Sequence, residues 1–296
     1  MLFFSIVVPV YNVEKYLEQC LESLKAQSFQ DYEVLCINDG STDNSRRILA
    51  EWEECFPQMK VIDRENGGLS AARNTGLKAS MGEYVVFVDS DDWVEPTMLS
   101  RLADEVKGED MVCFACRRTD NEKSDVLEAE QGGGWDYFNR HALEHREVAF
   151  VCVWQRCYRH RFLLENDLWF REGVLHEDNQ FTPRACLKAQ KIKVIPDVLY
   201  NYRVRPGSIM TTRGLRSKES LVLVANELSE IFGKEKNIEK KVIYQALTQC
   251  YQMAFLNNDR EDDSHLRQRV DWKLYRKVSR TKLRHRWNYL RNRFAL

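Results

Sequence analysis

The sequence predicts an α/β fold in which a mostly parallel sheet is flanked by helices. Over the first 117 residues, short apolar runs rich in β-branched side chains alternate with segments of helical periodicity. The 296 residues, 44% of them hydrophobic, can bury a sizeable core, and 13 Gly with six Pro are too few for a fibrous or low-complexity chain. Ligands of such sheets bind at the carboxyl ends of the strands, so the residues that follow each strand are the candidates for function.

The predicted elements follow one another closely along the chain. Residues 4–10 form a buried strand by their β-branched content, and apolar residues at helical spacing from Val13 to Leu24 predict a helix, with Asn12 as its N-cap. The elements expected next are a strand at 32–38, a helix at 45–55, a strand at 60–62, a helix at 70–78 and a strand at 83–88.

The remaining residues divide by composition. Residues 118–134 are polar and end in three glycines, which predicts a loop or irregular hairpin between two halves of one domain. We expect that domain at 1–215, with halves 1–117 and 118–215, and a C-terminal helical extension at 216–296. Residues 265–296 hold eleven Lys and Arg and one Asp, although the formal charge of the whole chain is only −1. This basic end fits an anionic membrane surface, a helical lid with a basic solvent face, or a nucleic-acid patch.

Nine scattered cysteines predict reduced thiols and a cytoplasmic protein. Cys113 and Cys116, three apart on an apolar segment, would point to opposite faces of a strand, which favours core packing over a zinc site. The first residues have no basic region and no cleavage site, and no apolar run approaches the ~18 residues of a membrane span, so we expect neither a signal peptide nor a transmembrane helix.

The strongest local motif is Asp89-Ser90-Asp91, which directly follows the strand at 83–88. Two carboxylates this close are costly to bury unless a cation or hydrogen-bond donors offset their repulsion. Mg²⁺ and Mn²⁺ prefer a few carboxylates together with substrate oxygens, so the motif predicts a divalent-cation site. The alternative is an acidic helix cap at Asp91 or Asp92.

Three further motifs follow the earlier strands: Val8-Pro-Val-Tyr-Asn12, Asn38-Asp-Gly-Ser-Thr-Asp43 and Asn66-Gly-Gly-Leu-Ser-Ala-Ala-Arg-Asn74. With Asp89-Ser-Asp91 they resemble the family-2 inverting glycosyltransferases of the GT-A fold, of the bacterial polysaccharide type. The resemblance extends over roughly the first two hundred residues, and four motifs in order at strand ends form a specific signal.

The resemblance implies a nucleotide-sugar site in residues 1–117. Tyr11 would lie against the base, or alternatively in the core, and Asp39 would accept a hydrogen bond from uracil, or merely start a turn. Arg73 would meet base or phosphate, its alternative being a surface salt bridge. The donor-site residues implied are Pro9, Val10, Tyr11, Asp39, Asn66, Arg73, Asp89, Ser90 and Asp91, with Asp91 and Asp89 on the metal.

An inverting displacement also needs a base for the acceptor hydroxyl. His176-Glu177-Asp178, before a predicted helix, resembles the acidic motif of the family, which implies Asp178 as the base and Glu177 as a residue that orients the acceptor. His176 is the second candidate for the base, because imidazole suits proton transfer near neutral pH. The alternative is a pair of acids favoured by the helix dipole.

Three further residues are implied for the acceptor or the diphosphate. Arg203 and Arg205 lie in a segment that resembles the loop closing over the site, and they pair with a diphosphate or anionic acceptor or else remain solvated. Trp154 forms a face for an acceptor sugar or packs in the core. Arg156 stands where the family usually has Lys, so a lysine-specific role does not carry over.

Residues and resemblance together predict a metal-dependent inverting hexosyltransferase of cell-surface polysaccharide synthesis, with Mg²⁺ or Mn²⁺, a UDP-linked donor and a glycan or lipid-linked acceptor. Such acceptors are often lipid-borne, which favours membrane contact of residues 265–296 over nucleic acid. The alternative is a non-catalytic nucleotide-sugar or carbohydrate-binding protein. A sugar-1-phosphate nucleotidyltransferase would carry a Gly-rich loop with a basic residue after the first strand, and a dehydrogenase a GxGxxG there; Pro9-Val-Tyr-Asn12 provides neither.

Overall fold

In the computed structural model the chain forms two compact units. The first consists of Met1–Tyr137, Cys152–Gly173 and Arg184–Arg205, and the second of Phe138–Val151, Val174–Pro183 and Pro206–Leu296. The predicted domain limits at 117 and 215 stay predictions. The residues that the structure describes are 2–119, 129–134, 136–138, 151–205, 214–234, 247, 250–251, 253–254 and 264–279.

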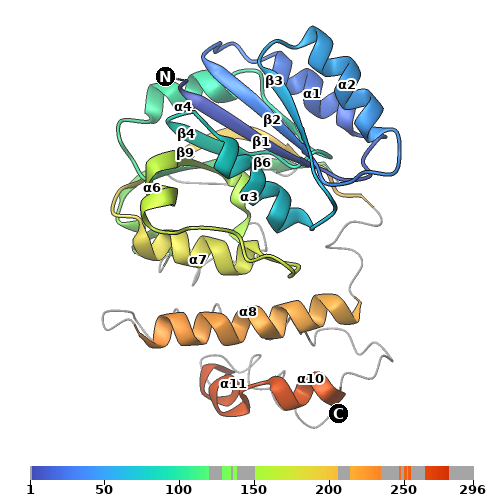
Figure 1. Ribbon diagram of the computed structural model, residues 1–296. Helices are drawn as coiled ribbons and strands as arrows, with labels where there is room; N and C mark the ends of the chain where they lie inside the picture. The colour runs from blue at the N-terminus through green and yellow to red at the C-terminus, as the bar shows by residue number, and fades with distance from the viewer. Residues whose placement is uncertain are drawn as a thin grey trace. The chain divides into compact units, whose positions relative to one another are not determined.

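A nine-stranded sheet forms the centre of the first unit (Figure 1). Its first four strands pair in parallel in the order β3-β2-β1-β4, and the path continues through β8, β6, β9 and β5. β6 and β9 are parallel, whereas β8, β5 and β7 run antiparallel to their neighbours. The predicted α/β fold is confirmed, with antiparallel strands added in its second half. The strands are β1 (Phe4–Val10), β2 (Tyr32–Asn38), β3 (Met59–Asp63), β4 (Tyr84–Phe87), β5 (Trp93–Val94), β6 (Met111–Arg118), β7 (Glu130–Gly132), β8 (Arg156–Arg159) and β9 (Ile192–Tyr202).

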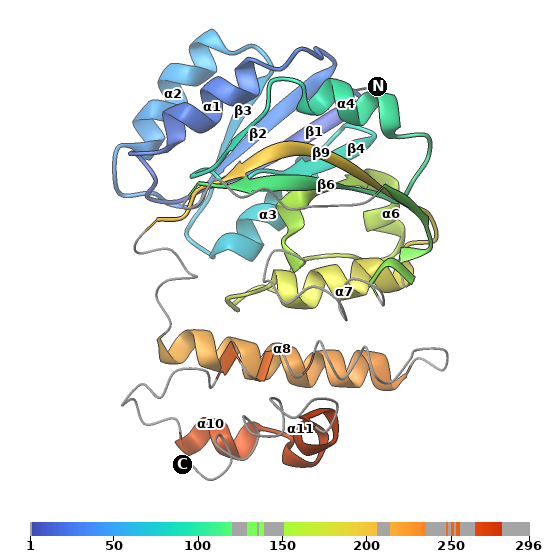
Figure 2. The same cartoon turned by 180° about the vertical axis from the view of Figure 1, so that it is seen from behind.

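Helices cover both faces of this sheet. Figure 1 and Figure 2 show α3 (Leu69–Ala79) on one face and α1 (Leu17–Lys25), α2 (Ser45–Cys55) and α4 (Met98–Glu105) on the other. Alternate residues of β1 explain this arrangement: Ile6 and Val8 join the core cluster under α1, α2 and α4, whereas Val7 meets α3. A Cβ on Gly76 of α3 would lie 2.2 Å from Val7 Cγ1, so only glycine permits this close approach.

The other helices lie later in the chain. Short segments η2 (Val153–Gln155) and α6 (His160–Glu165) flank β8, and α7 (Asp178–Lys188) begins in the second unit. Among the residues that the structure describes, three further helices follow, α8 (Leu215–Gly233), α10 (Ser264–Arg269) and α11 (Trp272–Ser279). Residues 280–296 of the basic end lie outside the described residues. In the described part of the chain, none of the helices has the length and apolar character that a membrane span needs.

Asn12 does not cap the first helix, contrary to the prediction. The helix begins at Leu17, and Asn12 instead has a φ of 51° and accepts a hydrogen bond on Oδ1 from the Thr42 amide at 2.8 Å. Asn tolerates this left-handed conformation better than most residues. The residue therefore ties the end of β1 to the loop after β2.

All nine cysteines are free thiols. Cys113 and Cys116 are buried in β6, which confirms core packing for this pair.

Gly82, just before β4, offers a test of the sheet packing. A Cβ there would lie 2.5 Å from both the carbonyl carbon of Phe4 and the amide nitrogen of Ser5. Backbone of a buried strand cannot move aside cheaply, so we expect Gly82→Ala to lower the free energy of unfolding by about 2–3 kcal/mol in urea denaturation. Gly132→Ala, with nothing within 4 Å of its Cβ, is the control. Equal stability of the two variants would contradict the close approach.

Candidate active site

The predicted donor-site residues gather at one edge of the sheet in the first unit. β1 pairs in parallel with β2 and β4, so the carboxyl ends of these strands lie side by side (Figure 1). Pro9 and Val10 are buried at the end of β1, whereas Tyr11 just beyond them is 49% exposed. Ser90, after β4, is buried. An exposed aromatic ring at a strand end is available to a ligand, which a core tyrosine is not.

Asp39 follows β2 and fixes the glycine loop before α3. Its Oδ1 accepts a hydrogen bond from the Gly67 amide at 3.0 Å and its Oδ2 one from the Gly68 amide at 2.8 Å. Arg64 Nη1 lies 3.3 Å from Oδ1, and Asn66 Nδ2 donates to the carbonyl oxygen of Asp39 at 3.0 Å. A carboxylate can accept about four hydrogen bonds, so this role is compatible with a further contact to a bound base.

Arg73 of α3 forms a buried ion pair rather than a surface one. Its side chain is 3% exposed, and Nη2 donates to Asp89 Oδ1 at 2.6 Å. The guanidinium also lies 5.4 Å from the centre of the Phe170 ring. This short ion pair orients the Asp89 carboxylate toward α3.

Asp91 lies against two arginines that follow β9. Arg205 Nε is 2.6 Å from Asp91 Oδ2, and Arg203 Nε donates to the carbonyl oxygen of Asp91 at 2.8 Å. Burial raises the pKa of the Asp91 carboxyl most, repulsion from Asp89 raises it further, and Arg205 opposes both. A hard divalent cation would relieve the same repulsion, so this pair of carboxylates fits Mg²⁺ or Mn²⁺.

The predicted site did not include Asp92 and Tyr200, whose buried hydrogen bonds hold the turn at residues 89–92 in place. Asp92 is 1% exposed; its Oδ2 accepts a hydrogen bond from Tyr200 Oη and its Oδ1 one from the Arg203 amide, both at 2.7 Å. Tyr200 Oη in turn accepts one from the Asp89 amide at 3.1 Å. Burial, and then repulsion from Asp91 and Asp89, raises the pKa of Asp92 well above its usual range. α4 begins only at Met98, so neither Asp91 nor Asp92 caps a helix.

Trp154 packs in the core of the first unit. It is 5% exposed and stacks against two side chains of β9, with its ring centre 4.4 Å from that of Tyr200 and 5.3 Å from that of Tyr202. This geometry favours the packing role that the sequence left open beside an acceptor-sugar face. Through Tyr200, the stack supports the hydrogen bond that Asp92 accepts.

The second unit holds the predicted acceptor residues at the start of α7. His176 has a φ of 61°, and its Nε2 lies 2.7 Å from Ser217 Oγ of α8. Glu177 is 4% exposed, and its carbonyl oxygen accepts a hydrogen bond from the Phe181 amide at 2.9 Å. Asp178 is partly exposed, and its Oδ1 accepts one from the Asn179 amide at 2.9 Å. Of the three, Asp178 and not Glu177 or His176 keeps a solvent-accessible side chain.

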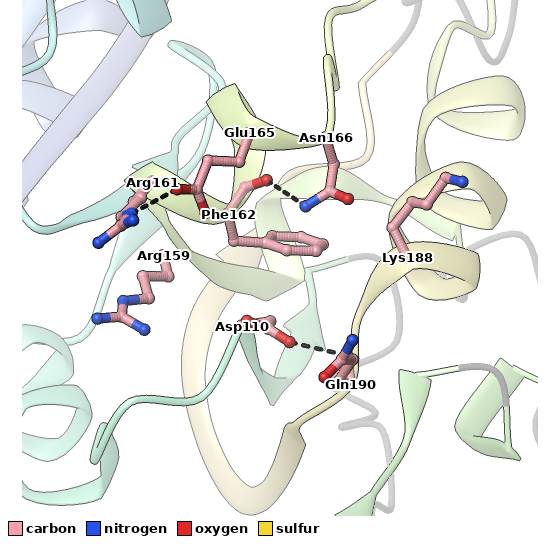
Figure 3. Close-up of a pocket in the computed structure, with 8 residues that line it drawn as sticks. All are labelled: Asp110, Arg159, Arg161, Phe162, Glu165, Asn166, Lys188 and Gln190. Carbon is pink, nitrogen blue, oxygen red and sulfur yellow. Dashed lines mark hydrogen bonds and ion pairs between the residues drawn. The ribbon is translucent and has the colours of Figure 1, made fainter.

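A pocket of about 270 Å³ lies at the other edge of the sheet (Figure 3). Asp110 precedes β6 and Gln190 precedes β9; β6 and β4 both run antiparallel to β8, so Asp110 is at the edge opposite Asp89. The Asp110 carboxylate accepts a hydrogen bond from the Gln190 amide at 2.8 Å, and Arg161 pairs with Glu165 at 2.6 Å. This pocket is separate from the candidate site. Its lining residues are Asp110, Arg159, Arg161, Phe162, Glu165, Asn166, Lys188 and Gln190.

Comparisons with known proteins identify similar chains. The family model described as Glycosyl transferase family 2 matches residues 5–166. The chain is 34% identical over 213 residues to the uncharacterized glycosyltransferase EpsJ of Bacillus subtilis (strain 168), covering 69% of this chain and 62% of that protein. It is also 34% identical over 244 residues to the putative glycosyltransferase EpsH of the same organism, covering 79% and 70%.

Among solved structures, S. aureus TarS 1–349 in complex with UDP-GlcNAc is similar with a TM-score of 0.74. The sequence identity is 25%, and the match covers 99% of this chain and 89% of that one.

Proposed function

The chain belongs to glycosyl transferase family 2, and on that premise we propose that it transfers a hexose, with inversion, from a nucleotide sugar to a hydroxyl of a glycan or lipid-linked acceptor. The observation that carries the proposal is the convergence of Asp39, Arg73, Asp89 and Asp91 at one sheet edge. The chain spans only 62% of the length of EpsJ. The acceptor and the pathway of this chain are therefore part of the proposal.

A uridine nucleotide is the proposed donor carrier. The similar TarS structure is a complex with UDP-GlcNAc, and in this chain the buried Asp39 carboxylate can accept a hydrogen bond from the N–H of a uracil imide. Tyr11, half exposed at the end of β1, provides a ring face for the base. Asn66, in the loop before α3, holds that loop beside the end of β2 through its bond to the Asp39 carbonyl oxygen.

Asp91 and Asp89 are proposed to hold Mg²⁺ or Mn²⁺ with the donor diphosphate. When bound, the cation supplies charge stabilisation for the departing nucleoside diphosphate. Arg73 keeps Asp89 oriented, and Arg203 and Arg205 add positive charge where the diphosphate would lie.

Asp178 is the proposed base that takes the proton of the acceptor hydroxyl, with Glu177 orienting the acceptor. The partly exposed Asp178 carboxylate suits proton transfer to a bound alcohol, whereas His176, the second candidate, is buried and bonded to Ser217. A cytoplasmic reaction at the membrane surface, with residues 265–296 on anionic lipid, is the proposed setting.

The proposal is tested by a screen of nucleotide sugars against the full chain. With Mn²⁺ present, we expect UDP and at least one UDP-sugar to raise the unfolding temperature by several degrees, because a ligand at a hundred times its Kd stabilises the native state by about 2.7 kcal/mol. UDP release with a supplied glycan acceptor then separates an enzyme from a non-catalytic binding protein. If no uridine nucleotide at millimolar concentration raises the unfolding temperature, the proposed uridine-nucleotide site is wrong.

A further inference from the structure

Arg203 and Arg205 approach the same turn but contact different groups. The Arg203 amide donates to the Asp92 carboxylate at Oδ1, and Arg203 Nε donates to the backbone carbonyl oxygen of Asp91. Its Nη2 donates to Gln19, and its guanidinium lies 4.8 Å from the centre of the Trp93 ring. A side chain held by this many partners is already ordered, so keeping it in place when a ligand binds costs little conformational entropy.

Arg205, in contrast, contacts the carboxylate of Asp91. Its Nε lies 2.6 Å from Asp91 Oδ2, and its guanidinium lies 5.2 Å from the centre of the Tyr16 ring. The two side chains of the pair are 23% and 20% exposed, so water can reach both and the pair can open without stranding a charge in the core.

A divalent cation and Arg205 compete for Asp91. Both neutralise the same carboxylate beside Asp89, and two positive charges a few ångströms apart repel each other. A guanidinium displaced from a carboxylate finds an equivalent partner in a phosphate group, because both present paired oxygens. Loss of the ion pair is therefore offset only when cation and diphosphate arrive together.

We propose that Arg205 is an exchangeable counter-ion of Asp91, which keeps the carboxylate in place before the donor arrives and then gives it up to the donor's cation, whereas Arg203 is a positioning residue that stays bound. The inference rests on the proposed function and deepens it. Its consequence is that the ligand-free chain binds the cation weakly and that UDP strengthens cation binding.

The test is Mn²⁺ binding to the full chain, measured by calorimetry or by the electron paramagnetic resonance signal of the free ion, with and without UDP. We expect Arg205→Gln to bind Mn²⁺ alone about tenfold more tightly than the unaltered chain, and to lose most of the strengthening by UDP. Arg203→Gln should change the affinity in the opposite direction, because the carbonyl oxygen of Asp91 loses its side-chain donor and only the backbone amide of residue 203 still holds the turn.

Arg161→Gln is the matched control. It also removes an arginine whose Nε lies 2.6 Å from a carboxylate, but its pair with Glu165 is well exposed and lies at the other sheet edge. We expect its Mn²⁺ affinity to equal that of the unaltered chain.

The outcomes separate the inference from the function on which it rests. If UDP and Mn²⁺ bind but Arg205→Gln leaves Mn²⁺ affinity unchanged or weaker, the exchange is wrong and the donor site stands. If UDP binds and Mn²⁺ does not, both the exchange and the cation assignment are wrong. If the unaltered chain binds no uridine nucleotide, the proposed function itself fails.

Discussion

Replacing Asp91 by asparagine is expected to lower kcat/KM for sugar transfer about 10²- to 10³-fold, the range for loss of one preorganised electrostatic contact. The change keeps the shape of the side chain but removes the charge that would hold the cation against the diphosphate. It also removes the repulsion from Asp89, so we expect the unfolding temperature to be retained. UDP release under saturating acceptor, together with a thermal melt, measures both effects.

Asp197→Asn is the control for this variant. Asp197 lies on β9 and also pairs with an arginine, at 2.9 Å from Arg101 Nε, but it lies outside the turn that holds Asp89, Asp91 and Asp92. Its loss should leave transfer within about twofold, since exposed ion pairs contribute little. Unchanged turnover in Asp91→Asn would show that Asp91 does not hold the donor's cation.

Replacing Asp178 by asparagine is expected to lower kcat about 10²- to 10⁴-fold, the contribution of a positioned general base. Asparagine keeps a side-chain oxygen that can accept the Asn179 amide bond, so the start of α7 should persist with a cost of no more than about 1 kcal/mol from the helix dipole. Single-turnover kinetics with bound donor isolates the chemical step from binding.

Two neighbouring variants decide between candidates for the base. Glu177→Gln should mainly raise KM for the acceptor, because Glu177 is assigned to orientation. His176→Gln should mainly lower the free energy of unfolding and change kcat little, since the buried ring bonds to Ser217. A greater loss of kcat in His176→Gln than in Asp178→Asn would transfer the base role to the imidazole.

The first half of the fold could be predicted because its signals are local. β-Branched runs such as 4–10 and helical spacing such as 45–55 reflect which residues of one segment are buried, and this needs no knowledge of distant segments. β8 was not predicted, since Arg156–Arg159 begins and ends with arginine and lies between antiparallel partners far away in sequence. The cap at Asn12 was wrong because its partner, Thr42, lies thirty residues away.

The candidate site was predictable as a set of residues but not as a set of contacts. The motifs placed Asp39, Asp89 and Asp91 after strands, and parallel pairing then required them to share an edge. Nothing in the sequence indicates that Arg205 pairs with Asp91, because 114 residues separate them. Asp92 and Tyr200 were missed for the same reason, although the third acid in the run was a usable signal.

Helix α3 connects the two ends of the proposed donor site. Its leading glycine amides bind Asp39, and about one and a half turns further on Arg73 binds Asp89, while Gly76 locks the helix against β1. A nucleobase that fits badly beside Asp39 would thus displace a helix whose Arg73 orients Asp89, one of the two carboxylates proposed to hold the cation. Discrimination between nucleotides would then appear in turnover as well as in affinity.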